Sequence, residues 1–252
     1  MNNTEISDIT IIRRDGSKTE KEVRLLKEHE LRILINEKPA MNLVCTKENL
    51  RELVYGRLLT EGFIEKAADV QKLWFCKYEA EATVLLDENA EIIEAEQNEK
   101  SCCTGNRVLL FRKGSRSPGK LPPAEYRPEW IFSMADCFAK GMPLHDITGS
   151  THSCILSRKG EILFSCEDIG RHNAVDKAVG YGILNGIPLS ECILYTSGRV
   201  PVDMAQKAIA AGIPMLVSKS IPTTDALELA AEYNLTIIGK SHGDSMTIYE
   251  QR

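Results

Sequence analysis

The sequence predicts an α/β protein (α+β overall), with a sheet flanked by helices in its second half and a smaller N-terminal α+β subdomain. Three observations lead to this prediction. Residues 9–45 alternate apolar and polar positions around turn signals, which is typical of an antiparallel hairpin or meander. Residues 153–249 alternate apolar runs with segments of helical periodicity, which predicts a largely parallel sheet. A Pro- and Gly-rich stretch lies between them, so we expect domains at 1–120 and 121–252.

The remaining elements of the first half follow the strands of residues 9–45. Thr46 can cap a helix over residues 47–60, whose leucines recur at helical spacing. Two strand candidates come next, at 70–78 and 82–86.

Two oppositely charged stretches follow these strands. Residues 87–99 hold six carboxylates and no basic residue, a pattern that is typical of a solvated face. Residues 100–120 hold six basic residues and no acidic one, and they end in Pro and Gly. This second stretch is expected to be a flexible linker.

The second half begins with a helix over about 128–140, where large apolar residues recur at helical spacing. Pro201 suits the first turn of a helix, and Gly212 and Pro214 suit its end. The expected strands are 153–156, 161–166, 192–195, 215–217, 236–238 and 247–249. The expected helices are 171–184, 201–211 and 223–233.

Composition excludes several classes of protein. The 252 residues are 43% hydrophobic and 27% charged, as in an ordinary globular protein. The net charge of −5 argues against nucleic-acid binding. There is no apolar run long enough to span a membrane and no signal-peptide pattern at the N-terminus. We therefore expect a cytoplasmic protein whose eight cysteines are reduced thiols.

The stretch 167–177 (EDIGRHNAVDK) is the most informative part of the chain. It gathers charged and imidazole side chains around Gly170, where an apolar strand is expected to turn into a helix. His172 and Asp176 are four residues apart and share a helix face. A helix start needs one capping group rather than five polar ones, so we favour a functional site over a well-capped helix end.

Two adjacent cysteines, Cys102 and Cys103, precede basic residues that would stabilise a thiolate, the form that attacks sulfur. The alternative is that both are accidental cysteines on a loop. The other six cysteines lie inside apolar patterns, where a thiol behaves as a small hydrophobe, so we expect them in the core. They are Cys45, Cys76, Cys137, Cys154, Cys166 and Cys192.

Metal and dinucleotide motifs find little support. His152 is followed by Ser153 and Cys154, and no Cys-x-x-Cys exists, so the zinc site of a deaminase is not expected, nor is any other metal site. The glycines of residues 180–186 have one residue too many for a dinucleotide fingerprint and lie at a helix end. Anions could instead bind the helix starts at 170–173 and 197–199, where arginine suits a phosphate or pterin edge.

The stretch 167–177 and other segments, in order, resemble the signature of the FdhD family, the formate dehydrogenase accessory sulfurtransferases. The other matching segments are 59–64 (LTEGFI), 149–152 (GSTH), 197–200 (SGRV), 211–214 (AGIP) and 246–249 (MTIY). The resemblance implies a cytidine-deaminase-like mixed sheet flanked by helices. It also implies a cytoplasmic homodimer that takes sulfur from a cysteine desulfurase. That sulfur would pass to the molybdenum cofactor, bis-molybdopterin guanine dinucleotide, of formate dehydrogenase.

The resemblance also implies site residues. Family members carry Cys-x-x-Cys in the cysteine loop, and the first cysteine bears the persulfide; here Gly105 stands at the second position, which leaves Cys102 and Cys103 as alternatives. The family segment that contacts the guanine nucleotide corresponds to Lys240, Ser241, His242, Gly243, Asp244 and Ser245. His242 replaces the usual arginine, and Thr247 the usual asparagine. On residues alone, an ordinary solvated hairpin turn explains this segment as well.

The hypothesis is a sulfurtransferase that carries a persulfide on Cys102 or Cys103. It holds the cofactor with residues 240–245 and with Arg171, His172 and Arg199. Glu167, Asp168 and His172 would orient these groups or move protons. The rival hypothesis is a binding protein that delivers the molybdenum cofactor without transferring sulfur.

Overall fold

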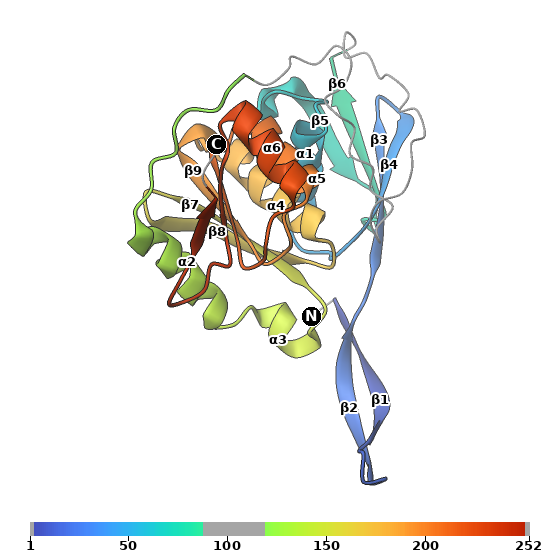
Figure 1. Ribbon diagram of the computed structural model, residues 1–252. Helices are drawn as coiled ribbons and strands as arrows, with labels where there is room; N and C mark the ends of the chain where they lie inside the picture. Colours follow the sequence, from blue (N-terminus) through green and yellow to red (C-terminus); the bar gives the residue numbers. More distant parts are fainter. Residues whose placement is uncertain (1–2, 88–118, 250–252) are drawn as a thin grey trace.

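The computed structural model describes residues 3–87 and 119–249. Its strands form three sheets of two, four and six strands, with helices on the larger ones (Figure 1). The α+β fold class is confirmed. The elements of the first half are β1 (Thr4–Ile12), β2 (Lys18–Leu26), β3 (His29–Ile35), β4 (Lys38–Cys45), α1 (Leu50–Thr60), η1 (Ala67–Asp69), β5 (Val70–Phe75) and β6 (Glu81–Leu86).

The second half contains the six-stranded sheet and most of the helices. Its elements are α2 (Pro128–Ala139), α3 (Pro143–Thr148), β7 (His152–Arg158), β8 (Glu161–Asp168), α4 (Arg171–Leu184), η2 (Leu189–Glu191), β9 (Cys192–Thr196), α5 (Val202–Ala210), β10 (Met215–Ser218), α6 (Thr224–Tyr233), β11 (Thr236–Gly239) and β12 (Thr247–Tyr249). The six strands lie in the order β12-β11-β10-β9-β7-β8. The strands and helices expected here are confirmed to within a few residues.

One expectation for this sheet was wrong. The β9-β10 and β10-β11 pairs are parallel, whereas the β12-β11, β9-β7 and β7-β8 pairs are antiparallel. The sheet is therefore mixed, which confirms the mixed sheet that the family resemblance implied, whereas the largely parallel sheet predicted from the alternation of strands and helices was wrong. The reason lies in the β7–β8 connection, which is a tight turn at Lys159 and Gly160 without a crossover helix, and such a turn can join only antiparallel strands.

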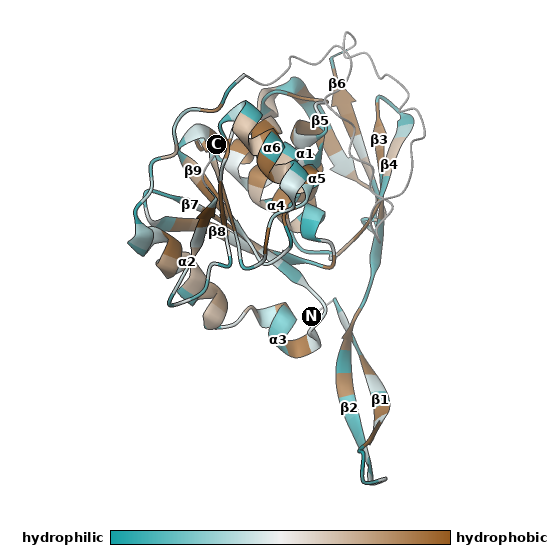
Figure 2. Ribbon diagram, viewed as in Figure 1, coloured by the Kyte–Doolittle hydropathy of each residue, from teal (hydrophilic) through white to brown (hydrophobic). Residues whose placement is uncertain are grey.

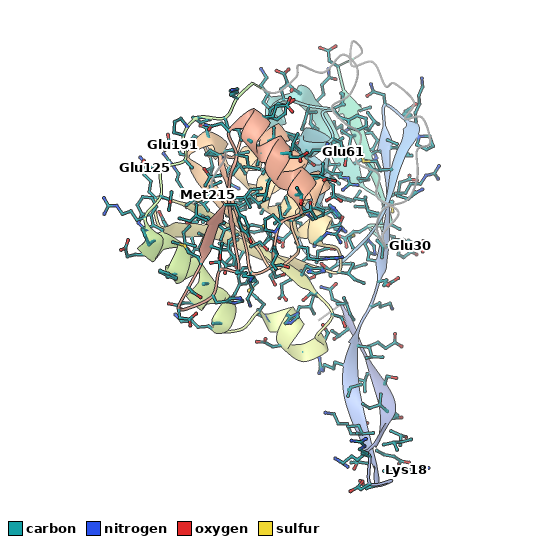
Figure 3. The ribbon with its side chains drawn as sticks, in the orientation of Figure 1. Lys18, Glu30, Glu61, Glu125, Glu191 and Met215 are labelled. Atoms are coloured by element: carbon teal, nitrogen blue, oxygen red, sulfur yellow. The ribbon has the colours of Figure 1, made fainter. Side chains whose placement is uncertain are left out.

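Successive residues of the central strands pack on opposite faces of this sheet. Leu194 and Leu216 join a core shared with α1, α4 and α5, while Ile193 and Met215 join a second core beneath α2. This period of two places helices on both faces, as Figure 1 shows. Met215 is labelled near the middle of the molecule in Figure 3.

Helices α1 and α4 cross at two glycines, and this crossing joins the two halves of the chain. A Cβ atom on Gly180 would overlap the carbonyl oxygen of Glu52, and one on Gly56 would overlap that of Asp176. The larger core also contains residues of both halves. The domain division near residue 120 stays a prediction. The linker residues 100–118 and the acidic residues 88–99 lie outside the described residues.

The β1–β2 hairpin extends away from the body as an arm (Figure 1), and Lys18 lies near its far end (Figure 3). Hydrophobic and hydrophilic residues alternate along it (Figure 2). Ile6 and Ile12 are 61% and 66% exposed, respectively. Across the part of the chain that the structure describes, the helices are too short or too polar to traverse a lipid bilayer.

Candidate cofactor site at the sheet edge

Four strands of the six-stranded sheet, β8, β9, β10 and β11, run in the same direction, and β7, which lies between β8 and β9 in the sheet, runs in the opposite direction. Their carboxyl ends meet at one edge of the sheet, and the turns that follow are joined by backbone hydrogen bonds. The amide of Lys219 donates to the carbonyl of Thr196 (3.2 Å), and the amide of Ser241 donates to that of Ser218 (3.0 Å). In open α/β sheets, ligands bind outside the carboxyl ends of the strands. We call this the carboxyl edge.

Cationic side chains gather at the carboxyl edge. Arg171 begins α4, Arg199 lies in the β9–α5 turn, and Lys219 and Lys240 follow β10 and β11. Arg199 and Lys240 are exposed, and the Arg171 side chain is 17% exposed. Because the protein is acidic overall, this local excess of positive charge is suited to an anionic ligand.

The helix starts at this edge add to the positive potential. Among the described residues, no side chain caps the N-terminus of α4 or α5, whereas Thr223 caps α6 by accepting from the amide of Ala226. Uncapped amides at a helix start and the helix dipole both favour an anion. The carboxyl edge therefore combines arginine side chains with two helix starts that have capacity for phosphate oxygens.

The turn at residues 240–245 lies at the same edge as the two arginines. Ser241 is buried and its carbonyl accepts from the hydroxyl of Tyr195 (2.8 Å), while its amide is tied to β10. The amide of His242 donates to the carbonyl of Ser245 (2.8 Å). Residues 242–245 and Lys240 are exposed. The structure thus brings together Arg171, Arg199 and residues 240–245, and contact of these residues with a guanine nucleotide stays a prediction.

His172 is placed differently from the arginines. It is 2% exposed, and its Nε2 lies 2.7 Å from Oδ2 of Asp203. Burial lowers the pKa of His172, and the hydrogen bond to Asp203 only partly offsets this. The imidazole is therefore neutral at pH 7, and Nε2 carries the hydrogen that it donates to the carboxylate. Asp203 was not among the site residues predicted from the sequence, where its only signal is an acidic residue in the first turn of the helix after Pro201.

Asp168 and Lys177 form a buried ion pair that joins the two halves. Both side chains are fully buried, and Lys177 Nζ lies 2.7 Å from Oδ2 of Asp168. Thr46, just after β4, donates its amide to Oδ2 (3.0 Å) and accepts from Lys177 through its hydroxyl (2.7 Å). Asn173 and the amide of Gly170 bond the other oxygen, Oδ1. Donors surround the Asp168 carboxylate, which contacts residues of both halves of the chain and does not contribute to the carboxyl edge.

A second buried network is centred on Asp176, which lies one helical turn after His172 in α4. Asp176 accepts from Lys207 (2.8 and 3.0 Å), from Arg57 (3.0 Å) and from the hydroxyl of Thr60 (2.7 Å). Glu61 lies within 3.6 Å of Lys207 and within 3.3 Å of Arg57; it is labelled beside the helices in Figure 3. Burial alone would raise the pKa of Asp176, but the charges of Lys207 and Arg57 outweigh this effect and lower it.

Glu167 has a local structural role. Its two carboxylate oxygens accept from the amides of Leu144 (2.8 Å) and His145 (2.7 Å) at the start of α3, a short helix that sequence patterns did not predict. It also accepts from the hydroxyl of Thr151 (2.9 Å). The stretch 167–177 is therefore divided by function: Arg171 and His172 belong to the carboxyl edge, and its acidic residues and Lys177 hold elements together.

The cysteines of the described residues are mostly inert thiols. Burial raises the pKa of Cys45 and of Cys166 to about 12 and that of Cys192 to about 11, and it also raises the pKa of Cys154 well above the usual value of a thiol. Cys137 is half-buried. The core prediction is wrong for Cys76, which is exposed. Cys76 directly follows the edge strand β5, at a turn where hydrogen bonds from backbone amides, chiefly that of Tyr78, lower its pKa. Cys102 and Cys103 lie outside the described residues.

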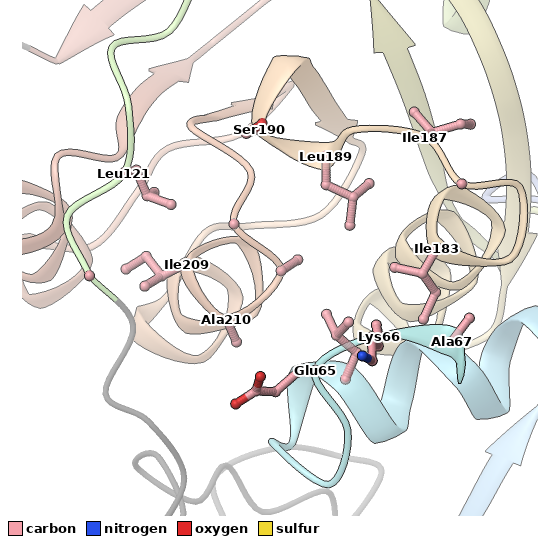
Figure 4. A pocket seen from close by; sticks show the side chains of 15 residues that line it. Glu65, Lys66, Ala67, Leu121, Ile183, Ile187, Leu189, Ser190, Ile209 and Ala210 are labelled. Carbon is pink, nitrogen blue, oxygen red and sulfur yellow. The ribbon is translucent and has the colours of Figure 1, made fainter. Parts of the chain in front are cut away.

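A cavity of about 540 Å³ lies at the other end of the helices (Figure 4). Leu121, Ile183, Leu189 and Ile209 point into it, with Glu65 at its border. It is lined by the carboxyl ends of α4 and α5, far along these helices from the carboxyl edge. Over residues 3–87 and 119–249, no cluster of three or more His, Cys, Asp or Glu side chains is suited to hold a metal ion.

Comparison with known proteins assigns the chain to a family. The model of the FdhD/NarQ family matches residues 26–252, from the end of β2 onward. The chain belongs to the FdhD/NarQ family. The match includes the carboxyl edge, the α1–α4 joint and the segment that carries Cys102 and Cys103, but it leaves out most of the β1–β2 arm.

Curated relatives agree with this assignment. "Sulfur carrier protein FdhD" of Streptomyces coelicolor is 34% identical over 94% of this chain and 90% of its own length. The protein of the same name from Bacillus subtilis is 30% identical over 93% of this chain and 91% of its own. A crystal structure of a protein proposed to be a formate dehydrogenase accessory protein, from Desulfotalea psychrophila, matches with a TM-score of 0.78 at 23% identity. It covers 98% of this chain and 97% of its own, so it shows the same fold.

Proposed function

We propose that this FdhD-family protein is a sulfur carrier with sulfurtransferase activity. It takes persulfide sulfur from a cysteine desulfurase and passes it to the molybdenum cofactor, bis-molybdopterin guanine dinucleotide, that formate dehydrogenase requires. The names of the relatives support sulfur carriage, and the Desulfotalea protein supports the link to formate dehydrogenase. The protein acts in the cytoplasm.

Cys102 and Cys103 are the proposed sulfur carriers. A thiolate of one of them attacks the outer sulfur of the desulfurase persulfide; a new S–S bond forms and the desulfurase thiolate leaves. The basic residues that follow in the sequence favour this thiolate. Release of the carried sulfur as sulfide needs two electrons, which a second thiol supplies as it forms a disulfide. The raised pKa values of Cys45, Cys154, Cys166 and Cys192 argue against these buried thiols as carriers.

The carboxyl edge is the proposed site for the cofactor. The observation that carries this proposal is the convergence of Arg171, Arg199 and the 240–245 turn on two uncapped helix starts at one sheet edge. Each guanine dinucleotide arm of the cofactor holds a pyrophosphate, whose charge suits arginine and helix-start amides. The protein holds the cofactor as a substrate.

Isothermal titration with GDP, a fragment of the cofactor, tests this site. We expect the wild type to bind GDP and Arg199→Ala to bind it more weakly, by about 10-fold for a lost charge-assisted contact. Arg158→Ala is the matched control, because Arg158 lies at the opposite end of β7 and pairs with Glu191. Absence of heat with a folded wild type, or equal weakening by both variants, would contradict the site.

The rival function is delivery of the cofactor without sulfur transfer, which the adjacent rather than spaced cysteines favour. A cell that lacks this protein separates the two functions. We expect the double variant Cys102→Ala/Cys103→Ala to fail to restore formate dehydrogenase activity, while Cys76→Ala restores it. Full restoration by the double variant would support the chaperone instead.

The proposed assembly is a homodimer, and the β1–β2 arm is suited to contact a second copy. A two-stranded hairpin is marginally stable alone, and this one exposes Ile6, Ile12 and Leu25. We expect Ile6→Glu/Ile12→Glu to shift the protein toward monomer in light scattering at equal concentration. Tyr78→Glu, at a residue 73% exposed on the β5–β6 turn, is the control. A monomeric wild type would refute the dimer.

A further inference from the structure

We infer that Asp203 is a positioning residue of the carboxyl edge: it holds Arg171 and His172 in place so that Arg171 meets the anion. This inference rests on the anion site of the proposed function and adds a residue to which no role there has been assigned. Asp203 lies in the first turn of α5, whereas Arg171 and His172 lie in the first turn of α4. One carboxylate therefore ties together the two uncapped helix starts.

The two side-chain contacts of Asp203, with His172 and Arg171, lie on a single carboxylate oxygen. Oδ2 accepts from Nε2 of His172 at 2.7 Å and lies 3.9 Å from a terminal nitrogen of Arg171. The Asp203 side chain is 13% exposed and that of His172 is 3% exposed, so water competes weakly for these contacts. The contact to Arg171 is an ion pair rather than a hydrogen bond, which leaves the guanidinium donors available for a ligand.

Two buried atoms at this point have no partner among the described residues. They are Nε of Arg171 and Oδ1 of Asp203. Buried donors and acceptors are nearly always paired, so an unpaired donor and an unpaired acceptor on neighbouring side chains indicate a site that a ligand or water completes. The same pairing is already complete one turn further along the helices, where Asp176 and Lys207 satisfy each other.

The backbone of Gly198 packs closely against the side chain of Arg171. A Cβ atom at Gly198 would lie 2.9 Å from Cβ of Arg171 and 3.3 Å from its Cδ, both closer than side chains normally approach. The Gly198 turn itself is braced, because its amide donates to Thr196 Oγ1 (3.1 Å) and its carbonyl accepts from Ser218 Oγ (2.6 Å). Arg171 thus lies against both a charged neighbour and a fixed backbone, which preorganises it for a phosphate.

The electrostatic balance of the site supports a positioning role. Burial alone would raise the pKa of Asp203, but the hydrogen bond from His172 and the positive charge of Arg171 outweigh burial and lower the pKa. Asp203 is therefore a carboxylate at neutral pH beside an anion site. A negative charge there repels an anionic ligand, and the positioning of Arg171 by Asp203 offsets this repulsion.

GDP titration of three variants tests the inference. Asp203→Asn removes the charge and keeps the shape, and Gly198→Ala moves Arg171 without changing any charge. We expect both to weaken GDP binding about 10- to 100-fold, the range for a displaced charge-assisted contact. Asp225→Asn is the matched control: Asp225 occupies the same position in the first turn of α6 and is exposed, so binding should stay within about twofold.

The direction of the Asp203→Asn effect is decisive. If Asp203 acted on the ligand only through its charge, its neutralisation would strengthen GDP binding. If it were merely a structural residue, the variant would unfold more easily and bind GDP as well as the wild type. Either result, or an unchanged affinity in folded Gly198→Ala, would overturn the inference.

A second readout separates this inference from the proposed function. Nitrogen-15 NMR of the ligand-free protein reports the His172 ring directly. We expect one neutral Nε2–H tautomer in the wild type and in Gly198→Ala, and loss of this pattern in Asp203→Asn. A wild type that binds no GDP but shows the fixed tautomer would contradict the cofactor site while leaving the positioning contact intact. A mixture of tautomers in the wild type would overturn the positioning contact itself.

Discussion

Replacing Lys207 with Met should destabilise the protein strongly, because Lys207 neutralises a buried carboxylate at the α1–α4–α5 joint. Its Nζ lies 2.8 and 3.0 Å from the oxygens of Asp176, 2.9 Å from the hydroxyl of Thr60 and 3.6 Å from Glu61. The network contains two basic residues, Arg57 and Lys207, and two acidic ones, Asp176 and Glu61, so it is neutral. The variant leaves one uncompensated negative charge.

The expected loss follows from this burial. The side chains of Lys207 and Asp176 are 2% and 0% exposed, respectively. Breaking a buried pair by removing one partner costs about 3–5 kcal/mol, since the remaining charge is desolvated and unpaired. Met keeps most of the volume of the lysine stem, so a cavity adds little. We therefore expect a loss of about 3–5 kcal/mol in the free energy of unfolding.

Urea unfolding followed by circular dichroism measures this loss, and a second substitution isolates its cause. Lys207→Met/Glu61→Gln restores neutrality and should recover about half of the loss, on the order of 2 kcal/mol. Lys159→Met is the control, because the Lys159 side chain is 59% exposed and forms a solvent-exposed ion pair with Glu191 at 3.7 Å. Its effect on the free energy of unfolding should stay below about 0.5 kcal/mol. A loss of less than about 1 kcal/mol in Lys207→Met, or further loss in the double variant, would refute the reasoning.

Three other predictions concern the joint, the thiols and pH. Gly180→Ala should lower the free energy of unfolding by about 3 kcal/mol or more, because the added Cβ would overlap the backbone of α1. Gly182→Ala, on the same helix, should cost less, because its Cβ would meet the movable end of the Leu189 side chain. Equal urea midpoints of the two variants would contradict the helix crossing. Cys76 should react with iodoacetamide faster than Cys154 or Cys166, as peptide mass spectrometry would show; equal rates would contradict the burial pattern. Because burial lowers the pKa of His172 below its usual ~6.5, the folded protein favours the neutral imidazole more than the unfolded chain does, and this difference contributes to stability. Its contribution is complete above that value and decreases as pH falls, so the free energy of unfolding should decrease from pH 7 to pH 5. His172→Gln should flatten this slope, and an unchanged slope would count against it.

Local patterns predicted most of the strands and helices because each element carries its own periodicity. The continuous apolar run Ile193, Leu194 and Tyr195, for example, is consistent with a strand buried on both faces, and the structure packs successive residues of this run into opposite cores. The parallel character of the sheet was overestimated because strand direction depends on the connection between strands. α3 was missed because its start is capped by Glu167, more than 20 residues away in sequence.

The candidate site shows the same limit. Arg171 and Arg199 were predictable, since cationic residues at helix starts are visible in the sequence. The partners of Asp168 and Asp176 were not, because Thr46, Arg57 and Thr60 come from the other half of the chain and approach only in the fold. Asp203 carried only a weak signal, an acidic residue in a helix start, until the structure placed it against His172.

Transfer of labelled sulfur tests the central proposal, sulfur carriage on Cys102 or Cys103, most directly. The purified protein is incubated with a cysteine desulfurase and ³⁵S-cysteine, then separated on a non-reducing gel. We expect label on the wild type and on Cys76→Ala, released by dithiothreitol, and no label on Cys102→Ala/Cys103→Ala. Label that persists on the double variant, or an unlabelled wild type beside a labelled desulfurase, would contradict sulfur carriage by these two cysteines.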